Sequence, residues 1–125
     1  MTRAEKAMAY HQGGFNCCQA VLLAFSDQLR LSEEVLKRMG SSLGGGMYTG
    51  EATCGALIGA QMVQGMRLYR GEKLKAESAA LLEDFKARVG ATKCGDIKRE
   101  ETQNPLCSCD DCIRHAVGAL EEQLR

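Results

Sequence analysis

Residues 40–59 read GSSLGGGMYTGEATCGALIG, a glycine-rich loop followed by an apolar run that predicts a helix. Thr53 is a good residue to cap the amino end of that helix, which places Cys54 in its first turn. Unpaired backbone N–H groups and the helix dipole favour a thiolate there. Because the thiolate is both the nucleophile of sulfur redox chemistry and the form that binds metals, Cys54 is the first candidate functional residue.

Helices are expected on both sides of this stretch, because the chain has one proline and little β-branched content. Capping residues and glycines predict six helices. The first runs from the capping pattern of Thr2 and Glu5 to Gly13 and Gly14, the second covers 17–29 after Asn16, and the third covers 33–39 between Ser32 and Gly40. The fourth covers about 54–69, the fifth lies between Gly71 and Gly90, and the last follows Pro105. The polar stretch 91–105 is expected to be irregular. The expected fold class is all-α, a compact bundle of five to six helices, as a single domain over residues 1–125.

The charge balance removes two classes of partner. With 16 basic and 16 acidic side chains the formal net charge is zero, so nothing favours nucleic acid or an anionic membrane surface. No run approaches the roughly 18 apolar residues of a membrane span, and the first 14 residues lack the apolar core of a signal peptide. We therefore expect a cytoplasmic protein without membrane insertion. In that setting seven cysteines indicate metal binding or thiol chemistry.

The cysteines gather at expected helix starts. These thiols are Cys17 and Cys18 after Asn16, Cys54 after Thr53, and Cys112 in the first turn of the last helix. Cys94 lies in the irregular stretch, where a loop can bring it to the others. Helix N-termini lower thiol pKa values, in favourable cases to roughly 3.5–7.5. The placement therefore predicts functional thiols with lowered pKa values, and Cys54 as the most reactive one.

Several segments combine into a recognisable pattern. They are FNCCQAVLLAF (Phe15–Phe25), GGGM (Gly44–Met47), CGALIG (Cys54–Gly59), Cys94, and CIRHAVGALEEQL from Cys112. On these segments, which cover nearly the whole chain, the sequence resembles the small C_GCAxxG_C_C proteins, described as putative redox-active proteins. The resemblance implies redox activity and a link to a transporter system, since members are often associated with transporter genes.

The resemblance also implies that four of the seven cysteines are the family's characteristic ones: Cys17, Cys54, Cys94 and Cys112. Cys18 stands where the family usually has a small residue. Cys107 and Cys109 are additions, and with Cys112 they give a C-x-C-x-x-C run.

The first hypothesis is thiol–disulfide chemistry by these four cysteines, as a thiol–disulfide oxidoreductase with an unidentified redox partner. Cys54 attacks a disulfide or is oxidised, and Cys17 or Cys94 resolves the intermediate as an intramolecular disulfide. Because no C-x-x-C motif begins a helix after a strand, the site is not thioredoxin-like.

The second hypothesis is a metal site built from the same cysteines. Four thiolates from four segments can ligate a tetrahedral zinc or an iron–sulfur cluster. The cluster is the better metal hypothesis, because it would also supply redox activity. Less favoured ligands are Cys107, Cys109 and His115, the last of these one helical turn beyond Cys112.

The third hypothesis is a non-catalytic helical module for dimerisation or binding. Gly55 and Gly59, one turn apart beside two alanines, give a smooth helix face against which another backbone can pack, as in a homodimer.

Other side chains have structural explanations. His11 is expected to be exposed or satisfied, the charged run 98–101 to be a solvated surface, and Met39, Met62 and Met66 to fill the core. Gly44–Gly46 would let the backbone pass close to the cysteines.

Overall fold

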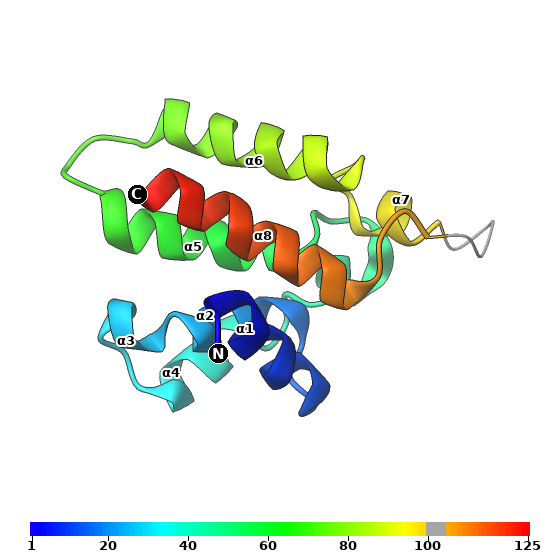
Figure 1. Ribbon diagram of the computed structural model, residues 1–125, viewed down its shortest axis with the longest axis horizontal. Coiled ribbons are helices and arrows are strands. Elements are labelled where there is room, and N and C mark those ends of the chain that lie inside the picture. The colour runs from blue at the N-terminus through cyan, green and yellow to red at the C-terminus, as the bar shows by residue number, and fades with distance from the viewer. Residues whose placement is uncertain (100–104) are drawn as a thin grey trace.

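Helices make up the part of the chain that the computed structural model describes, residues 1–99 and 105–125 (Figure 1). They are α1 (Arg3–Gln12), α2 (Cys17–Ala24), α3 (Ser26–Leu29), α4 (Glu33–Gly40), α5 (Gly55–Leu68), α6 (Lys75–Val89), α7 (Cys94–Lys98) and α8 (Cys109–Leu124), with a five-residue turn, η1 (Gly46–Gly50), before α5. Within these ranges, one isolated antiparallel bridge between Thr53 and Lys93 is the only β pairing. The all-α class is therefore confirmed. Nor does any helix of the described ranges have the length and apolarity that crossing a bilayer requires.

Local caps fix most helix boundaries where the sequence places them. Thr2 accepts the backbone N–H of Glu5 at 3.1 Å, and the Glu5 carboxylate accepts that of Thr2 at 2.9 Å, which completes a capping box. Asn16 forms the equivalent box at the start of α2, and Ser32 caps α4. Gly90 ends α6 in the left-handed region, with φ of 104°.

The helix expected over 17–29 is broken at Phe25, which separates α2 from α3. In a continuous helix the Ala24 carbonyl would accept the N–H of the residue four positions on. Instead, Arg3 Nη1 donates to the Ala24 oxygen at 2.6 Å, and its guanidinium lies 4.7 Å from the centre of the Phe25 ring. A side chain from α1 thus takes the carbonyl that helix continuation needs.

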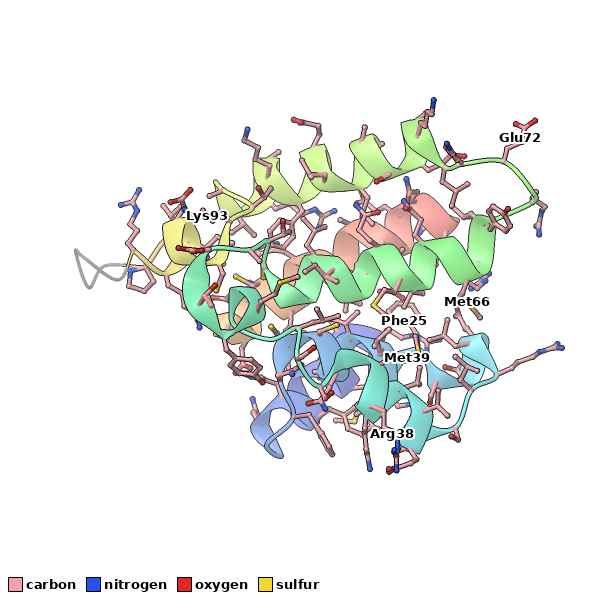
Figure 2. The ribbon with its side chains drawn as sticks, turned by 180° about the vertical axis from the view of Figure 1, so that it is seen from behind. Phe25, Arg38, Met39, Met66, Glu72 and Lys93 are labelled. Atoms are coloured by element: carbon pink, nitrogen blue, oxygen red, sulfur yellow. The ribbon has the colours of Figure 1, made fainter. Side chains whose placement is uncertain are left out.

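The helices pack as two groups around one core. α5, α6 and α8 run side by side, and α1 to α4 lie against them (Figure 1). α2 is the central element, because it contacts α1, α4, α5 and α8 and buries seven of its eight residues. Figure 2 shows Phe25 directed into the molecule, whereas Arg38, Glu72 and Lys93 point outward.

Close contact between α2 and α5 depends on the smooth face of α5. A Cβ added at Gly59 would lie 3.0 Å from the Cys18 carbonyl oxygen, so the two backbones approach as the sequence suggests. The methionine expectation is only partly confirmed. Met62 packs against the core, but Met39 and Met66 are 39% and 56% exposed, because they lie on outer faces of α4 and α5 (Figure 2).

Candidate functional site

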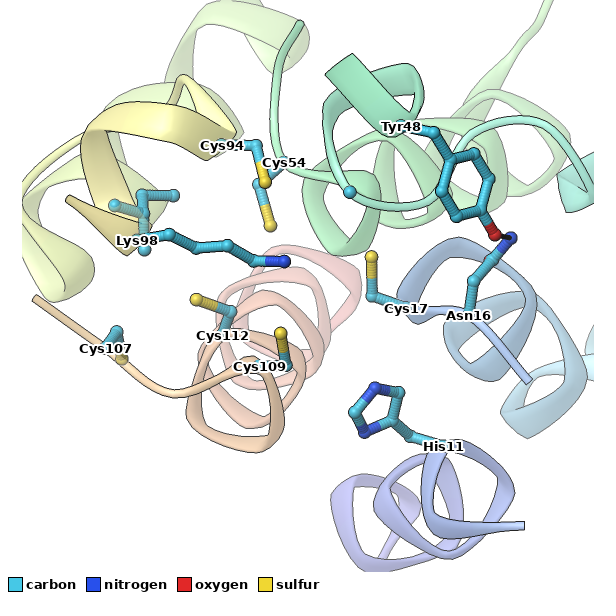
Figure 3. A pocket seen from close by; sticks show the side chains of 12 residues that line it. His11, Asn16, Cys17, Tyr48, Cys54, Cys94, Lys98, Cys107, Cys109 and Cys112 are labelled. Carbon is cyan, nitrogen blue, oxygen red and sulfur yellow. Dashed lines mark hydrogen bonds between the residues drawn. The ribbon is translucent and has the colours of Figure 1, made fainter. Parts of the chain in front are cut away.

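Six of the seven cysteines line one cavity of about 220 Å³, where the amino ends of α2, α5, α7 and α8 meet (Figure 3). The cysteines are Cys17, Cys54, Cys94, Cys107, Cys109 and Cys112. The rest of the lining is His11, Asn16, Gly45, Tyr48, Ile97 and Lys98. The four cysteines singled out by the family pattern thus lie together, although they come from four separate helices.

Backbone hydrogen bonds place Cys54 and Cys94 beside each other. The Cys54 N–H donates to the Thr92 oxygen at 2.8 Å, and the Cys94 N–H donates to the Ala52 oxygen at 2.9 Å. These bonds flank the Thr53–Lys93 bridge. They also explain why two predictions from the sequence, for Thr53 and for Cys94, were wrong. Thr53 does not cap α5, because its backbone is paired with Lys93 and Cys54 itself is the N-cap residue, without a side-chain capping bond.

The second correction concerns Cys94, which was expected in an irregular loop and instead begins the short helix α7. The bond from its amide to Ala52 orients that helix against the loop before α5. Glycine is needed on the facing side, since a Cβ on Gly46 would lie 2.7 Å from the Cys94 Cβ. The expectation that these loop glycines let the backbone pass close to the cysteines is confirmed.

Cys17 is positioned by the cap of α2 and by a glycine opposite it. Asn16 accepts the Gln19 N–H at 2.8 Å, and its Nδ2 donates to the Gly40 oxygen at 2.9 Å. Across the cavity wall, a Cβ on Gly55 would lie 2.5 Å from the Cys17 Sγ. The first glycine of CGALIG therefore makes room for the Cys17 sulfur.

A left-handed turn forms the rim beside Cys17. Four consecutive residues, Gly45 to Tyr48, have φ of 55°, 64°, 60° and 58°. This conformation costs a non-glycine residue about 1–2 kcal/mol, so Met47 and Tyr48 are strained. Asn16 Nδ2 donates to the Tyr48 hydroxyl oxygen at 3.0 Å and ties the turn to the start of α2.

The remaining three cavity cysteines belong to the start of α8. Ser108 caps this helix by accepting the Asp111 N–H at 3.1 Å, which makes Cys109 the first helical residue. Cys112 follows one turn later and is 4% exposed. Cys107 and Cys109 are partly exposed. The C-x-C-x-x-C run therefore has two sulfurs near solvent and one inside.

Hydrogen bonds join four of the thiols into a chain. Cys17 donates to Cys54, and Cys54 donates in turn to Cys112. Cys112 then donates to Cys107. Each sulfur in this chain contacts the next, and such contact is what thiol–disulfide exchange between them requires.

The thiol–thiol bonds and burial raise thiol pKa values instead of lowering them. Donation to Cys54, with burial second, raises the pKa of Cys17 far above its ordinary value. The bond to Cys112 raises the pKa of Cys54 to about 12, and burial raises the pKa of Cys18 to about 12. The expectation of lowered values is therefore wrong for these three helix-start thiols, because each is held away from water.

Lys98 projects from α7 toward the cysteine sulfurs (Figure 3). Its side chain is hydrogen-bonded to Cys109. Burial lowers the pKa of Lys98, but the neighbouring cysteines Cys109, Cys94 and Cys17 together raise it more, so the net shift is upward. The expected solvated surface at 98–101 is thus wrong for Lys98, while residues 100 and 101 lie outside the described residues. The spacing from Cys94 to Lys98 is one helical turn, a signal that the sequence carried.

His11 lies on the opposite wall of the cavity. Its Nδ1 is 2.8 Å from Asp110 Oδ1, so the expectation of a satisfied histidine is confirmed. Its position beside the cysteines has no local sequence signal, because 99 residues separate the two partners.

Two candidates from the sequence lie elsewhere. Neither Cys18 nor His115 belongs to the residues lining the cavity. The Cys18 thiol is fully buried in the core, and burial lowers the pKa of His115 on the side of α8. Among the residues that the structure describes, no three His, Cys, Asp or Glu side chains are arranged as they stand to hold a metal ion.

Comparison with known proteins agrees with the cysteine pattern. The family model described as "Putative redox-active protein (C_GCAxxG_C_C)" matches residues 15–123. Neither a curated protein nor a solved structure matches the chain.

Proposed function

Because the chain belongs to the C_GCAxxG_C_C family of putative redox-active proteins, we propose that it performs thiol–disulfide exchange at the six-cysteine cavity. One observation carries the proposal. Cys17, Cys54 and Cys112 come from three helices, yet hydrogen bonds join their sulfurs into one chain. A reducing, cytoplasmic setting, in which thiols stay reduced, suits this activity.

The reaction uses a disulfide as its substrate and two protein thiols as the reductant. A protein thiolate attacks one substrate sulfur, forms a mixed disulfide and releases the other sulfur, which takes up a proton. A second protein thiol gives up its proton and attacks the mixed disulfide. It releases the remaining substrate sulfur as a thiol and leaves an intramolecular disulfide. Two electrons and two protons pass from protein to substrate.

Cys54 is the proposed central thiol of the intramolecular disulfide. It contacts Cys17 on one side and Cys112 on the other, so it can pair with either. Burial at 5% exposure and its raised pKa leave Cys54 almost entirely protonated at neutral pH. These properties suit a resolving thiol better than the thiol that first meets an external disulfide.

The test oxidises the reduced chain with glutathione disulfide, counts free thiols and maps disulfides by peptide mass spectrometry. We expect the wild type to lose two free thiols per disulfide formed, with Cys54 in the mapped pair. Cys54→Ser should lose that pair while retaining its helical circular dichroism. Cys18→Ala is the matched control, because Cys18 is also buried but lies off the cavity. A wild type that keeps seven free thiols after equilibration would refute the proposal.

A metal site is the second candidate, because four thiols from four helices line one cavity, although they would have to move closer together to hold an ion. Thiolates suit zinc and iron–sulfur clusters, and the donors would be Cys17, Cys54, Cys94 and Cys112. Elemental analysis with a UV–visible spectrum of anaerobically purified protein separates the candidates. Stoichiometric iron with visible charge-transfer bands, or stoichiometric zinc, would replace the simple dithiol mechanism.

A further inference from the structure

The cavity cysteines divide into a buried and a partly exposed set. Cys17, Cys54, Cys94 and Cys112 are 9%, 5%, 4% and 4% exposed. Cys107 and Cys109 are partly exposed. Under the proposed function, on which this inference rests, an external disulfide must first meet a sulfur that it can reach. The first attack therefore falls to one of the two cysteines that the family pattern does not include.

Cys109 has the surroundings of an attacking thiol. It is the first residue of the 16-residue helix α8, where backbone N–H groups lack helical acceptors. Its side chain is hydrogen-bonded to Lys98 on α7, so the Cys109 sulfur is held beside a cationic group. Figure 3 shows the Lys98 amine extended among the cysteine sulfurs.

Cys107 has the less favourable surroundings of the two. Burial, the largest effect, raises the pKa of Cys107, although donation by Cys112 lowers it in part. Its sulfur already accepts a hydrogen bond from Cys112, which occupies it within the thiol chain. The comparison selects Cys109.

Cys109 and Cys112 together form a C-x-x-C dithiol at a helix start. Residues three apart on a helix share a face, with Cβ atoms about 5–6 Å apart, a separation from which small side-chain and backbone shifts reach a disulfide. The partly exposed sulfur belongs to Cys109, and the buried sulfur belongs to Cys112, one helical turn further along α8. From Cys112, a hydrogen bond continues to Cys54.

We propose that Cys109 is the thiol that first attacks the substrate disulfide, that Lys98 positions its sulfur, and that Cys112 resolves the mixed disulfide. The Cys109 sulfur bonds to one substrate sulfur, and the other leaves and takes up a proton. Cys112 loses its proton and attacks the Cys109 sulfur, which releases the second substrate thiol. Cys54 then attacks Cys112, so the disulfide moves inward and Cys109 returns to the thiol without a further oxidant.

Several charged groups lie around Cys109. Lys98 faces it from α7, and His11 faces the same cavity from α1, paired with Asp110. Asp111, on the same helix, is paired with Arg114 at 2.9 Å. Cys17 and Cys94 also lie close enough to Lys98 to interact with it electrostatically. Because both aspartates already have partners, Lys98 is the charged group that is hydrogen-bonded directly to the Cys109 side chain.

The first experiment is a short iodoacetamide pulse on the reduced full-length chain, read residue by residue by mass spectrometry over a range of pH. We expect Cys109 to be labelled first. Lys98→Met should slow its labelling about tenfold near neutral pH, because the hydrogen bond that positions the Cys109 sulfur is lost. Lys98→Arg should restore most of the rate, and Lys93→Met, which removes an exposed lysine, serves as the control. First labelling at another cysteine, or an unchanged labelling rate in Lys98→Met, would overturn the proposal.

The second experiment separates this inference from the proposed function. Glutathione disulfide is mixed with wild type, Cys109→Ser, Cys112→Ser and the control Cys18→Ala, and the rate of disulfide formation is followed. We expect Cys109→Ser to lose about a hundredfold in rate, and Cys112→Ser to retain glutathione on Cys109. If Cys109→Ser keeps the wild-type rate, the assignment of the attacking thiol fails while thiol–disulfide exchange stands. If the wild type forms no disulfide, both fail.

Discussion

Replacing Gly55 with alanine tests whether the first glycine of CGALIG exists to admit the Cys17 sulfur. A Cβ there would lie 2.5 Å from Cys17 Sγ and 2.5 Å from the Leu43 carbonyl oxygen. Ordinary contact begins near 3.4 Å, so these groups must move apart by about 0.9 Å. Since one of them is backbone, side-chain rotation alone does not relieve the contact. Overpacking of this kind costs about 1–3 kcal/mol.

Gly65, in the same helix, provides the matched control. A Cβ at that position meets nothing within 4 Å, so alanine should stabilise the chain by about 0.5–1 kcal/mol through helix propensity alone. Urea unfolding of the two variants should therefore give changes of opposite sign, about 1.5–4 kcal/mol apart. Gly55→Ala should also slow formation of the Cys54 disulfide with glutathione disulfide. Equal stability of both variants, with unchanged exchange rate, would refute the reasoning.

Three further predictions concern stability. Met47→Gly should raise the free energy of urea unfolding by about 1 kcal/mol, because it relieves the backbone strain of a left-handed residue whose side chain is 53% exposed. A loss of stability would contradict the inference that Met47 is strained. Asn16→Ala should lower the unfolding free energy by about 1–2 kcal/mol through loss of the α2 cap, measured by thermal unfolding; an unchanged midpoint would show the cap to be dispensable. The raised pKa values keep the Cys18 and Cys54 thiols neutral in the folded chain. The contribution of these thiols to folding stability is therefore complete below their ordinary pKa of 9.0 and is lost as the pH rises toward about 12. Urea unfolding at about pH 10 should show about 1.4 kcal/mol less stability for each such thiol than at about pH 8, and a smaller loss in Cys54→Ser; a flat profile would contradict the shifts.

Local sequence patterns were sufficient for most of the fold. The capping boxes at Thr2 and Asn16 involve residues three positions apart, so their interactions can be inferred from the sequence alone. The break at Phe25 could not be predicted in this way. It depends on Arg3, 21 residues before the carbonyl that it binds, and no local pattern reports that contact.

The sequence was sufficient to predict which cysteines form the site. It was not sufficient to predict the direction of their pKa shifts. The sequence showed that Cys17, Cys54 and Cys112 share the same type of position, at the start of a helix. Such a position does not reveal whether the side chain is buried. Burial and thiol–thiol bonding then reversed the expected direction of the pKa shifts. Lys98 was hidden in a charged run because α7 was not predicted, and without that helix its spacing from Cys94 carried no meaning.

The paired backbone segments around Thr53 and Lys93 have a consequence for redesign. Main-chain amides, which every residue except proline possesses, hold the Cα atoms at positions 54 and 94. The frame of this part of the cavity is therefore independent of the side chains that it displays. Serine, which is close to cysteine in size, would be presented from the same points in space at these two buried positions, so the nucleophile can be exchanged while the backbone bonds stay in place.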